Sequence, residues 1–140
     1  MQEILVDEDY RAQADFRHAL RQFLRVSERN ARAAGITPQQ HLLLLAVRGH
    51  RSNPQVTIAE IAEHLQLRHN GASLLVDRAV QRGLLQRVPD PRDRRRAQVS
   101  LTATGRAILT EITLANRAEL HPLEEAVEHL GKQIQQLRQA

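Results

Sequence analysis

The chain has 140 residues, no cysteine and only 2% aromatic residues. This length is enough to bury a hydrophobic core. The absence of cysteine excludes disulfide scaffolds and cysteine-based zinc sites. The low aromatic content excludes a stacking platform for single-stranded nucleic acid. The longest apolar run, Leu42–Val47, is far shorter than the roughly 20 residues of a membrane span, and Met1–Asp9 lacks the apolar core of a signal peptide. We therefore expect a soluble, cytoplasmic protein.

The positive charge is concentrated in one segment. Between Gln66 and Arg96 the sequence has eight arginines and three aspartates, a net charge of +5, whereas the rest of the chain carries a net charge of −1. A basic surface of this kind is typical of proteins that bind nucleic acid.

The first part of the chain is predicted to form two helices. Apolar residues recur at helical spacing over Glu8–Ala33, and Gly35 ends this helix. Thr37–Gln40 then combines a capping threonine, a proline at the first helical position and a glutamine three residues after the cap. These residues predict a second helix that ends in the loop Gly49–Pro54.

A helix-turn-helix is predicted next. Thr57–Glu60 is another capping box, and the apolar residues behind it lie on one helical face. A short break at Gln66-Leu67 precedes a helix over Arg68–Arg82, which Gly83 can close. Two short helices with so brief a connection are typical of this DNA-binding motif.

A charged hairpin follows the second of these helices. Leu84–Val88 and Ala97–Leu101 are short and apolar enough to be strands, and the segment Pro89–Arg96 between them has two prolines that disfavour a helix. A basic hairpin in this position is a wing.

The C-terminal region is predicted to be helical from Ala103, with a break or kink at Pro122. Apolar residues after that point alternate spacings of three and four, as in the seam between two packed helices. The seam consists of Leu120, Leu123, Val127, Leu130, Ile134 and Leu137. We expect it to pack against a partner.

The outer face of the helix over Arg68–Arg82 is the candidate base-reading surface. Arg68 and His69 could reach guanine or phosphate, Asn70 could pair with adenine, and Ser73 lies on the same side. Capping of the helix is the alternative role for Asn70.

Three neighbouring positions have alternative roles. For Asp77 and Arg78, a local ion pair is the simpler role. Leu74 is an unusual residue for an outer face, and it either touches a thymine methyl group or packs on a neighbouring helix.

The wing carries the second set of candidate contacts. An arginine at its tip, Arg95, is suited to the narrow minor groove, and Asp93 is close enough in sequence to hold its guanidinium. Arg92, Arg94 and Arg96 would neutralise phosphates. The alternative interpretation is a solvated charged loop.

These motifs together resemble the MarR-type (multiple antibiotic resistance) regulators, over about Phe16 to Leu109. The similar segments are Gly35–Gln40, Leu65–Asn70, Val76–Arg78, Gly83–Leu85, Asp90–Arg95, and Val99–Thr102 with Gly105. The resemblance implies a mainly α fold with a small β-hairpin wing, in a single domain over residues 1–140. It also implies a winged helix-turn-helix lobe over 37–101, and an obligate homodimer joined by N- and C-terminal helices over 1–34 and 103–140.

The same resemblance implies binding to a pseudo-palindromic site in double-stranded DNA, with Asp93 orienting Arg95 as the minor-groove reader. Many such regulators are repressors released by small aromatic or phenolic ligands. Arg68 stands where many relatives have a capping serine, and Leu74 stands where many have a polar or basic residue. The resemblance therefore does not assign the base contacts of this chain at these two positions.

Other classes of function were weighed. The sequence has no His-Glu-x-x-His pair, glycine-rich phosphate loop or Gly-x-Ser-x-Gly elbow, so we expect no enzyme and no cofactor. His121 with Glu124 and Glu125 could bind a metal, but a solvated helix start is the simpler interpretation and no metal is expected. The remaining alternative is a winged helix that serves architecture or protein contacts without ligand control.

Overall fold

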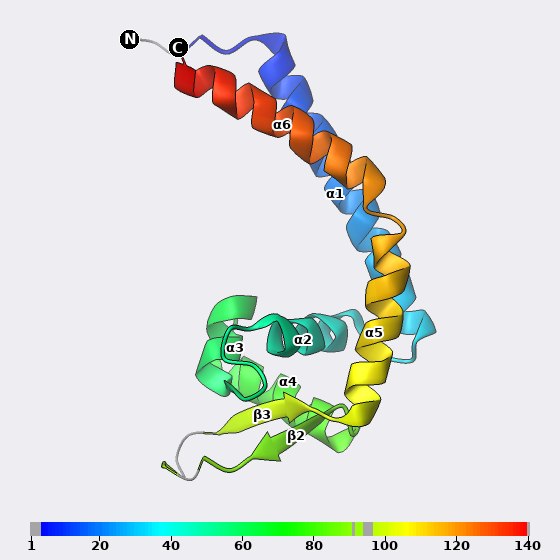
Figure 1. Cartoon of the computed structure of the whole chain (residues 1–140), viewed down its shortest axis with the longest axis vertical. Coiled ribbons are helices and arrows are strands. Elements are labelled where there is room, and N and C mark those ends of the chain that lie inside the picture. Colours follow the sequence, from blue (N-terminus) through cyan, green and yellow to red (C-terminus); the bar gives the residue numbers. More distant parts are fainter. Residues whose placement is uncertain (1–3, 91, 94–96, 140) are drawn as a thin grey trace. The chain divides into compact units, whose positions relative to one another are not determined.

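The protein is described by a computed structural model that covers residues 4–90, 92–93 and 97–139. It is mainly helical with a small antiparallel sheet, as predicted (Figure 1). In chain order the elements are α1 (Asp7–Ala33), α2 (Pro38–Gly49), β1 (Val56–Thr57), α3 (Ile58–Leu65), α4 (His69–Gln81), β2 (Leu85–Val88), β3 (Gln98–Leu101), α5 (Ala103–Arg117) and α6 (His121–Gln139). No helix in the described ranges is long and apolar enough to cross a membrane.

The chain forms two compact units. One combines Met1–Asn30 with Leu114–Ala140, and the other is continuous over Ala31–Thr113. We call them the terminal unit and the central unit. Helices α1 and α5 each run through both.

The sheet of the central unit has the strand order β1-β3-β2, and both pairs are antiparallel. The hairpin predicted from the sequence is β2 and β3, whose register pairs Leu85 with Leu101 and Val88 with Gln98. Strand β1 was not predicted, because two residues are too few to show an alternating pattern. It adds Val56 to the sheet opposite Val99, and both side chains are fully buried.

The hydrophobic core of the central unit lies between its helices and this sheet. Leu43 and Leu44 of α2, Ile61 of α3 and Val76 of α4 are all fully buried in it. The predicted helix ends are confirmed: Thr37 forms a capping box with Gln40 at the start of α2, and residue 83 after α4 has the positive φ of 72° that favours glycine. Both helices of the helix-turn-helix, α3 and α4, thus pack into the core of the central unit.

The terminal unit is built from the first part of α1, the end of α5 and α6. Helix α6 runs beside α1 (Figure 1), and the His129 Nε2 atom lies 2.6 Å from the Glu8 Oε1 atom. The predicted break at Pro122 is confirmed, since α5 ends at Arg117 and α6 begins at His121. A polar network joins α5 to α1: the Asn116 amide donates to the Ser27 hydroxyl at 3.0 Å and accepts from the Asn30 amide at 2.8 Å.

Helix α6 exposes its apolar seam. All of its residues are described, and none of them is buried. Val127, Ile134 and Leu137 are 43–49% exposed, and Leu120 just before the helix is 40% exposed. Two helices side by side bury little apolar surface, so this seam is still exposed to solvent in the single chain.

Candidate nucleic-acid interface

The turn between α3 and α4 depends on one strained residue. Gln66 follows α3 in the left-handed conformation, with φ 56° and ψ 45°, and its backbone N–H donates to the carbonyl groups of Ala62 and Glu63. The Leu67 N–H also donates to the Ala62 carbonyl, at 2.9 Å. These bonds satisfy the end of α3 and turn the chain into α4 within three residues.

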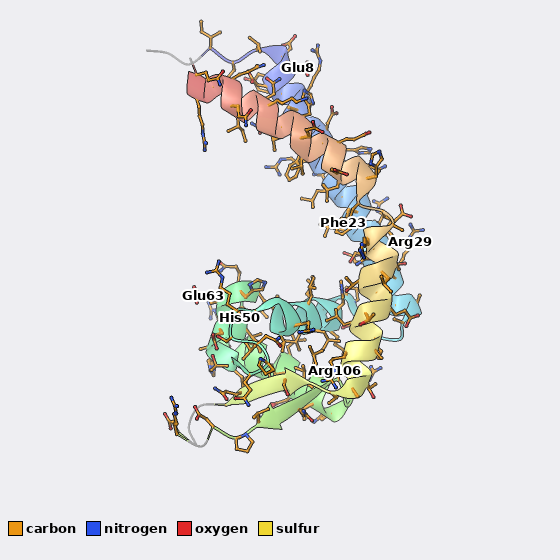
Figure 2. All side chains as sticks on the ribbon, in the orientation of Figure 1. Glu8, Phe23, Arg29, His50, Glu63 and Arg106 are labelled. Carbon is orange, nitrogen blue, oxygen red and sulfur yellow. The ribbon has the colours of Figure 1, made fainter. Side chains whose placement is uncertain are left out.

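The start of α3 is held by a hydrogen-bonded carboxylate. The Glu60 Oε1 atom accepts from the Thr57 backbone N–H at 3.0 Å and from its hydroxyl at 2.9 Å, while Oε2 accepts from the Ser52 hydroxyl at 2.5 Å. The Nδ1 atom of His50, labelled in Figure 2, lies 3.5 Å from Oε2. The hydrogen bond from Ser52, followed by that from the Thr57 backbone, lowers the pKa of Glu60 below its ordinary value. Ionised Glu60 therefore anchors the first helix of the motif.

The candidate residues at the start of α4 lie on its exposed side. Arg68 is the N-cap residue, and within the described structure its side chain makes no capping hydrogen bond. His69 and Asn70 are exposed in the first turn, and Ser73 is half-buried one turn later. Asn70 is not the N-cap residue, although its Oδ1 atom accepts a hydrogen bond from the Gly71 N–H at 3.0 Å. The prediction of Arg68 as the first helical residue is thus off by one.

The two faces of α4 differ in burial. Ala72, Val76 and Ala79 are fully buried. Leu74 is 51% exposed and does not belong to the core of the described residues. About half of the Leu74 side chain is therefore open to solvent on the outer face of α4.

An ion pair links α4 to the wing. Asp77 pairs with Arg87 of β2, and both side chains are about half exposed. The sequence indicated a local ion pair for Asp77. Its partner, Arg87, instead lies ten residues away on β2, where the turn at Gly83 brings the strand back to α4, and this partner was not predicted. The pair holds the first wing strand against the helix that carries the candidate base contacts.

The wing loop is described in part. Arg92 and Asp93 are exposed between β2 and β3, and the Arg92 N–H donates to the Asp90 carboxylate at 2.8 Å, which makes a local turn. Arg94, Arg95 and Arg96 lie outside the described residues. The pairing of Asp93 with Arg95 thus stays a prediction.

The wing is also tied to the start of α5. The Thr102 hydroxyl donates to the Gly83 carbonyl at 2.6 Å and accepts from the Gly105 N–H at 3.0 Å, while the Thr102 N–H donates to the Leu84 carbonyl at 3.1 Å. Arg106 of α5 is labelled in Figure 2, and its guanidinium donates to the Leu101 carbonyl at 3.0 Å. Thr102 and Gly105 belong to the similar segments identified from the sequence but had no predicted role. In the structure they join α4, the hairpin and α5.

A pocket of about 430 Å³ lies in the terminal unit, between α1 and the start of α6. Its walls combine apolar and cationic side chains, including those of Ala19, Phe23, Val26, Pro122, Arg25 and Arg29. Phe23 and Arg29 are labelled on α1 in Figure 2. Gln22 and Glu119 also line the pocket, so its walls carry both signs of charge.

His121 lies near two carboxylates but on an open surface. Its Nδ1 atom is 3.7 Å from Glu124 and its Nε2 atom is 3.2 Å from Glu125, and all three side chains are at least 71% exposed. Within the described part of the chain no group of three or more such residues is arranged to hold a metal ion.

The fold and this surface define a winged helix-turn-helix protein. The model of the MarR family matches residues 34–96, the segment from the end of α1 to the wing loop. The HTH-type transcriptional repressor MdtR of Bacillus subtilis is 31% identical over 84 residues, which cover 60% of this chain and 52% of that protein. The chain thus spans about half the length of this curated relative.

Solved structures agree with the family match over nearly the whole chain. The crystal structure of a MarR family transcription regulator has a TM-score of 0.73 and 26% identity, covering 92% of this chain and 85% of its own. A mutant MarR from E. coli complexed with operator DNA has a TM-score of 0.67 and 22% identity, covering 94% and 99%. Over residues 34–96 the chain is similar to the MarR family, whose relatives named here are described as transcription regulators.

Proposed function

We propose that the chain is a sequence-specific, double-stranded DNA-binding transcription regulator of the cytoplasm. One observation carries this proposal: the central unit exposes the start of α4 and a hairpin joined to it by the Asp77–Arg87 pair, in the segment that carries a net charge of +5. A helix with a polar outer face fits the major groove, and a basic loop beside it fits the neighbouring backbone. The DNA-bound relative supports the same use of this fold.

Within this proposal, α4 lies in the major groove and the wing reaches the adjacent minor groove. Arg68 and His69 contact phosphate or guanine, and the Asn70 amide N–H groups donate to a base edge. Arg92, Arg94 and Arg96 neutralise phosphates, and Arg95 enters the minor groove. Ser73 is half-buried and is therefore a minor contact.

We further propose that the functional species is a homodimer. The apolar seam of α6 is exposed in the single chain, and a second copy would cover it. Two copies would present two α4 helices to half-sites of a pseudo-palindrome, about one helical turn apart.

Repression and its release by a ligand complete the proposal. The curated relative is a repressor by name, which supports the same direction of control. The pocket beside Phe23 joins an aromatic wall to two arginines, a lining that suits a small aromatic or phenolic effector. Addition of such compounds to the DNA complex should weaken it, and Phe23→Ala should remove the response while DNA binding remains.

A selection experiment tests the central proposal. Purified protein is mixed with duplexes that have a random central sequence, and the bound fragments are sequenced and then titrated at several salt concentrations. We expect one enriched pseudo-palindromic sequence and an affinity that falls steeply with salt. Uniform weak binding to all duplexes would instead support an architectural role, and no binding would support a protein-interaction module.

The wing is tested with a matched pair of variants. Arg95→Ala should reduce affinity for the enriched duplex at least about tenfold, since it removes both a charge and a groove contact. Arg21→Ala removes the same charge from an exposed position in the terminal unit and should leave affinity nearly unchanged. Equal losses for the two variants would remove the wing from the mechanism.

A further inference from the structure

The outer face of α4 has one apolar side chain among polar ones. Asn70, Leu74, Arg78 and Gln81 are exposed along it, and Leu74 is exposed by 51%. The buried face is complete without Leu74, because Ala72, Val76 and Ala79 are fully buried and Leu75 and Val80 pack against the core. Leu74 is therefore not one of the buried core residues, and about half of its side chain is open to a partner on the outer face of α4.

The position of Leu74 relative to Asn70 fixes where it can reach. The two residues are four apart in the same helix, so they lie on the same side and about 6 Å apart along the helix axis. One base step of duplex DNA is about 3.4 Å, so a helix in the major groove would place Leu74 within about two base pairs of the base that faces Asn70.

Only one natural base offers an apolar group in the major groove. Thymine presents its C5-methyl group there, whereas the other base edges present hydrogen-bond donors and acceptors. A leucine side chain placed against those polar edges would leave their donors and acceptors without hydrogen bonds. This disfavours contact of the leucine with any base except at a thymine methyl group. The surrounding positive charge brings the helix to DNA but cannot choose among bases.

We infer that Leu74 is a specificity-determining residue that reads a thymine methyl group, one in each half-site of the bound duplex. This inference rests on the proposed DNA binding and names the base that it selects. The chain then prefers an A·T pair about two base pairs from the one that Asn70 faces, with the thymine methyl toward α4.

The test uses thymine replaced by uracil, which removes only the methyl group and leaves every hydrogen-bonding group in place. Each thymine of the selected duplex is replaced in turn, and affinity is measured for the unchanged protein, Leu74→Ala and Leu42→Ala. Leu42 is the matched control, because it is 48% exposed on α2 in the same unit. For the unchanged protein we expect a loss of about fourfold at one thymine of each half-site, the factor for burying one methyl-sized group.

The variants then assign that loss. Leu74→Ala should bind the thymine and uracil duplexes equally, while Leu42→Ala should keep the fourfold difference. Asn70→Ala should keep it as well, because it acts at a different base pair. The uracil scan of the unchanged protein needs no variant, so the absence of any methyl effect would overturn the inference even if Leu74→Ala misfolded.

The outcomes separate the inference from the proposed function. If the random duplexes yield no enriched sequence, sequence-specific binding itself is wrong. If a sequence is enriched but no uracil replacement weakens binding, or the difference persists in Leu74→Ala, the role of Leu74 is overturned while the regulator remains. A uniform loss by Leu74→Ala on all duplexes would also overturn it.

Discussion

Replacement of Gly105 by alanine should destabilise the central unit at the junction of α4, the wing and α5. A Cβ atom at this position would lie 2.1 Å from the Leu84 carbonyl oxygen and 3.1 Å from its carbon. The obstacle is backbone, so no side-chain rotation can relieve it. The Leu84 carbonyl would have to move by about 1 Å to reach an ordinary contact distance.

The expected loss follows from what that carbonyl holds. Overpacking at a well-packed site costs about 1–3 kcal/mol. The Leu84 carbonyl also accepts from the Thr102 N–H at 3.1 Å and the Thr102 hydroxyl at 3.2 Å, and weakening these bonds costs about 1 kcal/mol more. The better helix propensity of alanine returns about 1 kcal/mol. We therefore expect a net decrease of about 1–3 kcal/mol in the free energy of unfolding.

Thermal unfolding followed by circular dichroism measures this effect. For a chain of this size the loss corresponds to a decrease in Tm of about 4–12 °C. Gly71→Ala is the matched control, because it is also a helical glycine of the central unit and a Cβ there meets nothing within 4 Å. It should leave Tm unchanged or raise it slightly. A Gly105→Ala protein that melts within about 1 °C of the parent would show that the junction yields easily, and the reasoning would be wrong.

Three further predictions concern other parts of the chain. The pKa of Glu60 is lowered from 4.5 in the folded state, so its carboxylate stabilises the fold at pH values above 4.5, and this stabilisation is lost as the pH falls through the lower folded pKa. Glu60→Gln should therefore have a smaller difference between its urea midpoints at pH 7 and pH 3 than the parent protein has. An unchanged difference would contradict this prediction. Arg68→Ser should add the missing side-chain cap and raise the free energy of unfolding by about 0.5–1 kcal/mol. The same variant should weaken DNA binding, and tighter binding would exclude Arg68 from the interface. Val127→Glu should convert the proposed dimer to monomers in analytical ultracentrifugation, and Gln136→Glu, which lies outside the seam, should not; a Val127→Glu protein that stays dimeric would place the interface elsewhere.

Features controlled by neighbouring residues in the sequence were predicted well. The capping boxes at Thr37 and Thr57 mark the starts of α2 and α3 correctly, because a threonine and its partner three residues later act within one turn. Gly83 and Pro122 likewise mark where helices stop or restart. The hairpin was recognised because its prolines exclude a helix between two apolar runs.

Features that depend on contacts across the fold were predicted less well. Strand β1 exists because Val56 meets Val99, which no local pattern reveals. The Arg87 partner of Asp77 and the tight approach of Gly105 to Leu84 arise only once α4, β2 and α5 meet. For the candidate site, the sequence placed Asn70 correctly on the exposed side of α4, whereas Ser73 on the same predicted side is half-buried and the 51% exposure of Leu74 needed the structure.

The buried amide of Asn116 has a consequence for how the terminal helices find each other during folding. A displacement of α5 along α1 by a single turn would bury the Ser27 hydroxyl and the Asn116 amide without hydrogen bonds, whereas leucines in their place would tolerate such a slip. The hydrogen bond from the Asn30 amide to Asn116 would also be lost by such a displacement. Misaligned pairings of the two helices would thus be unstable, and the polar residues favour a unique alignment at some cost in stability.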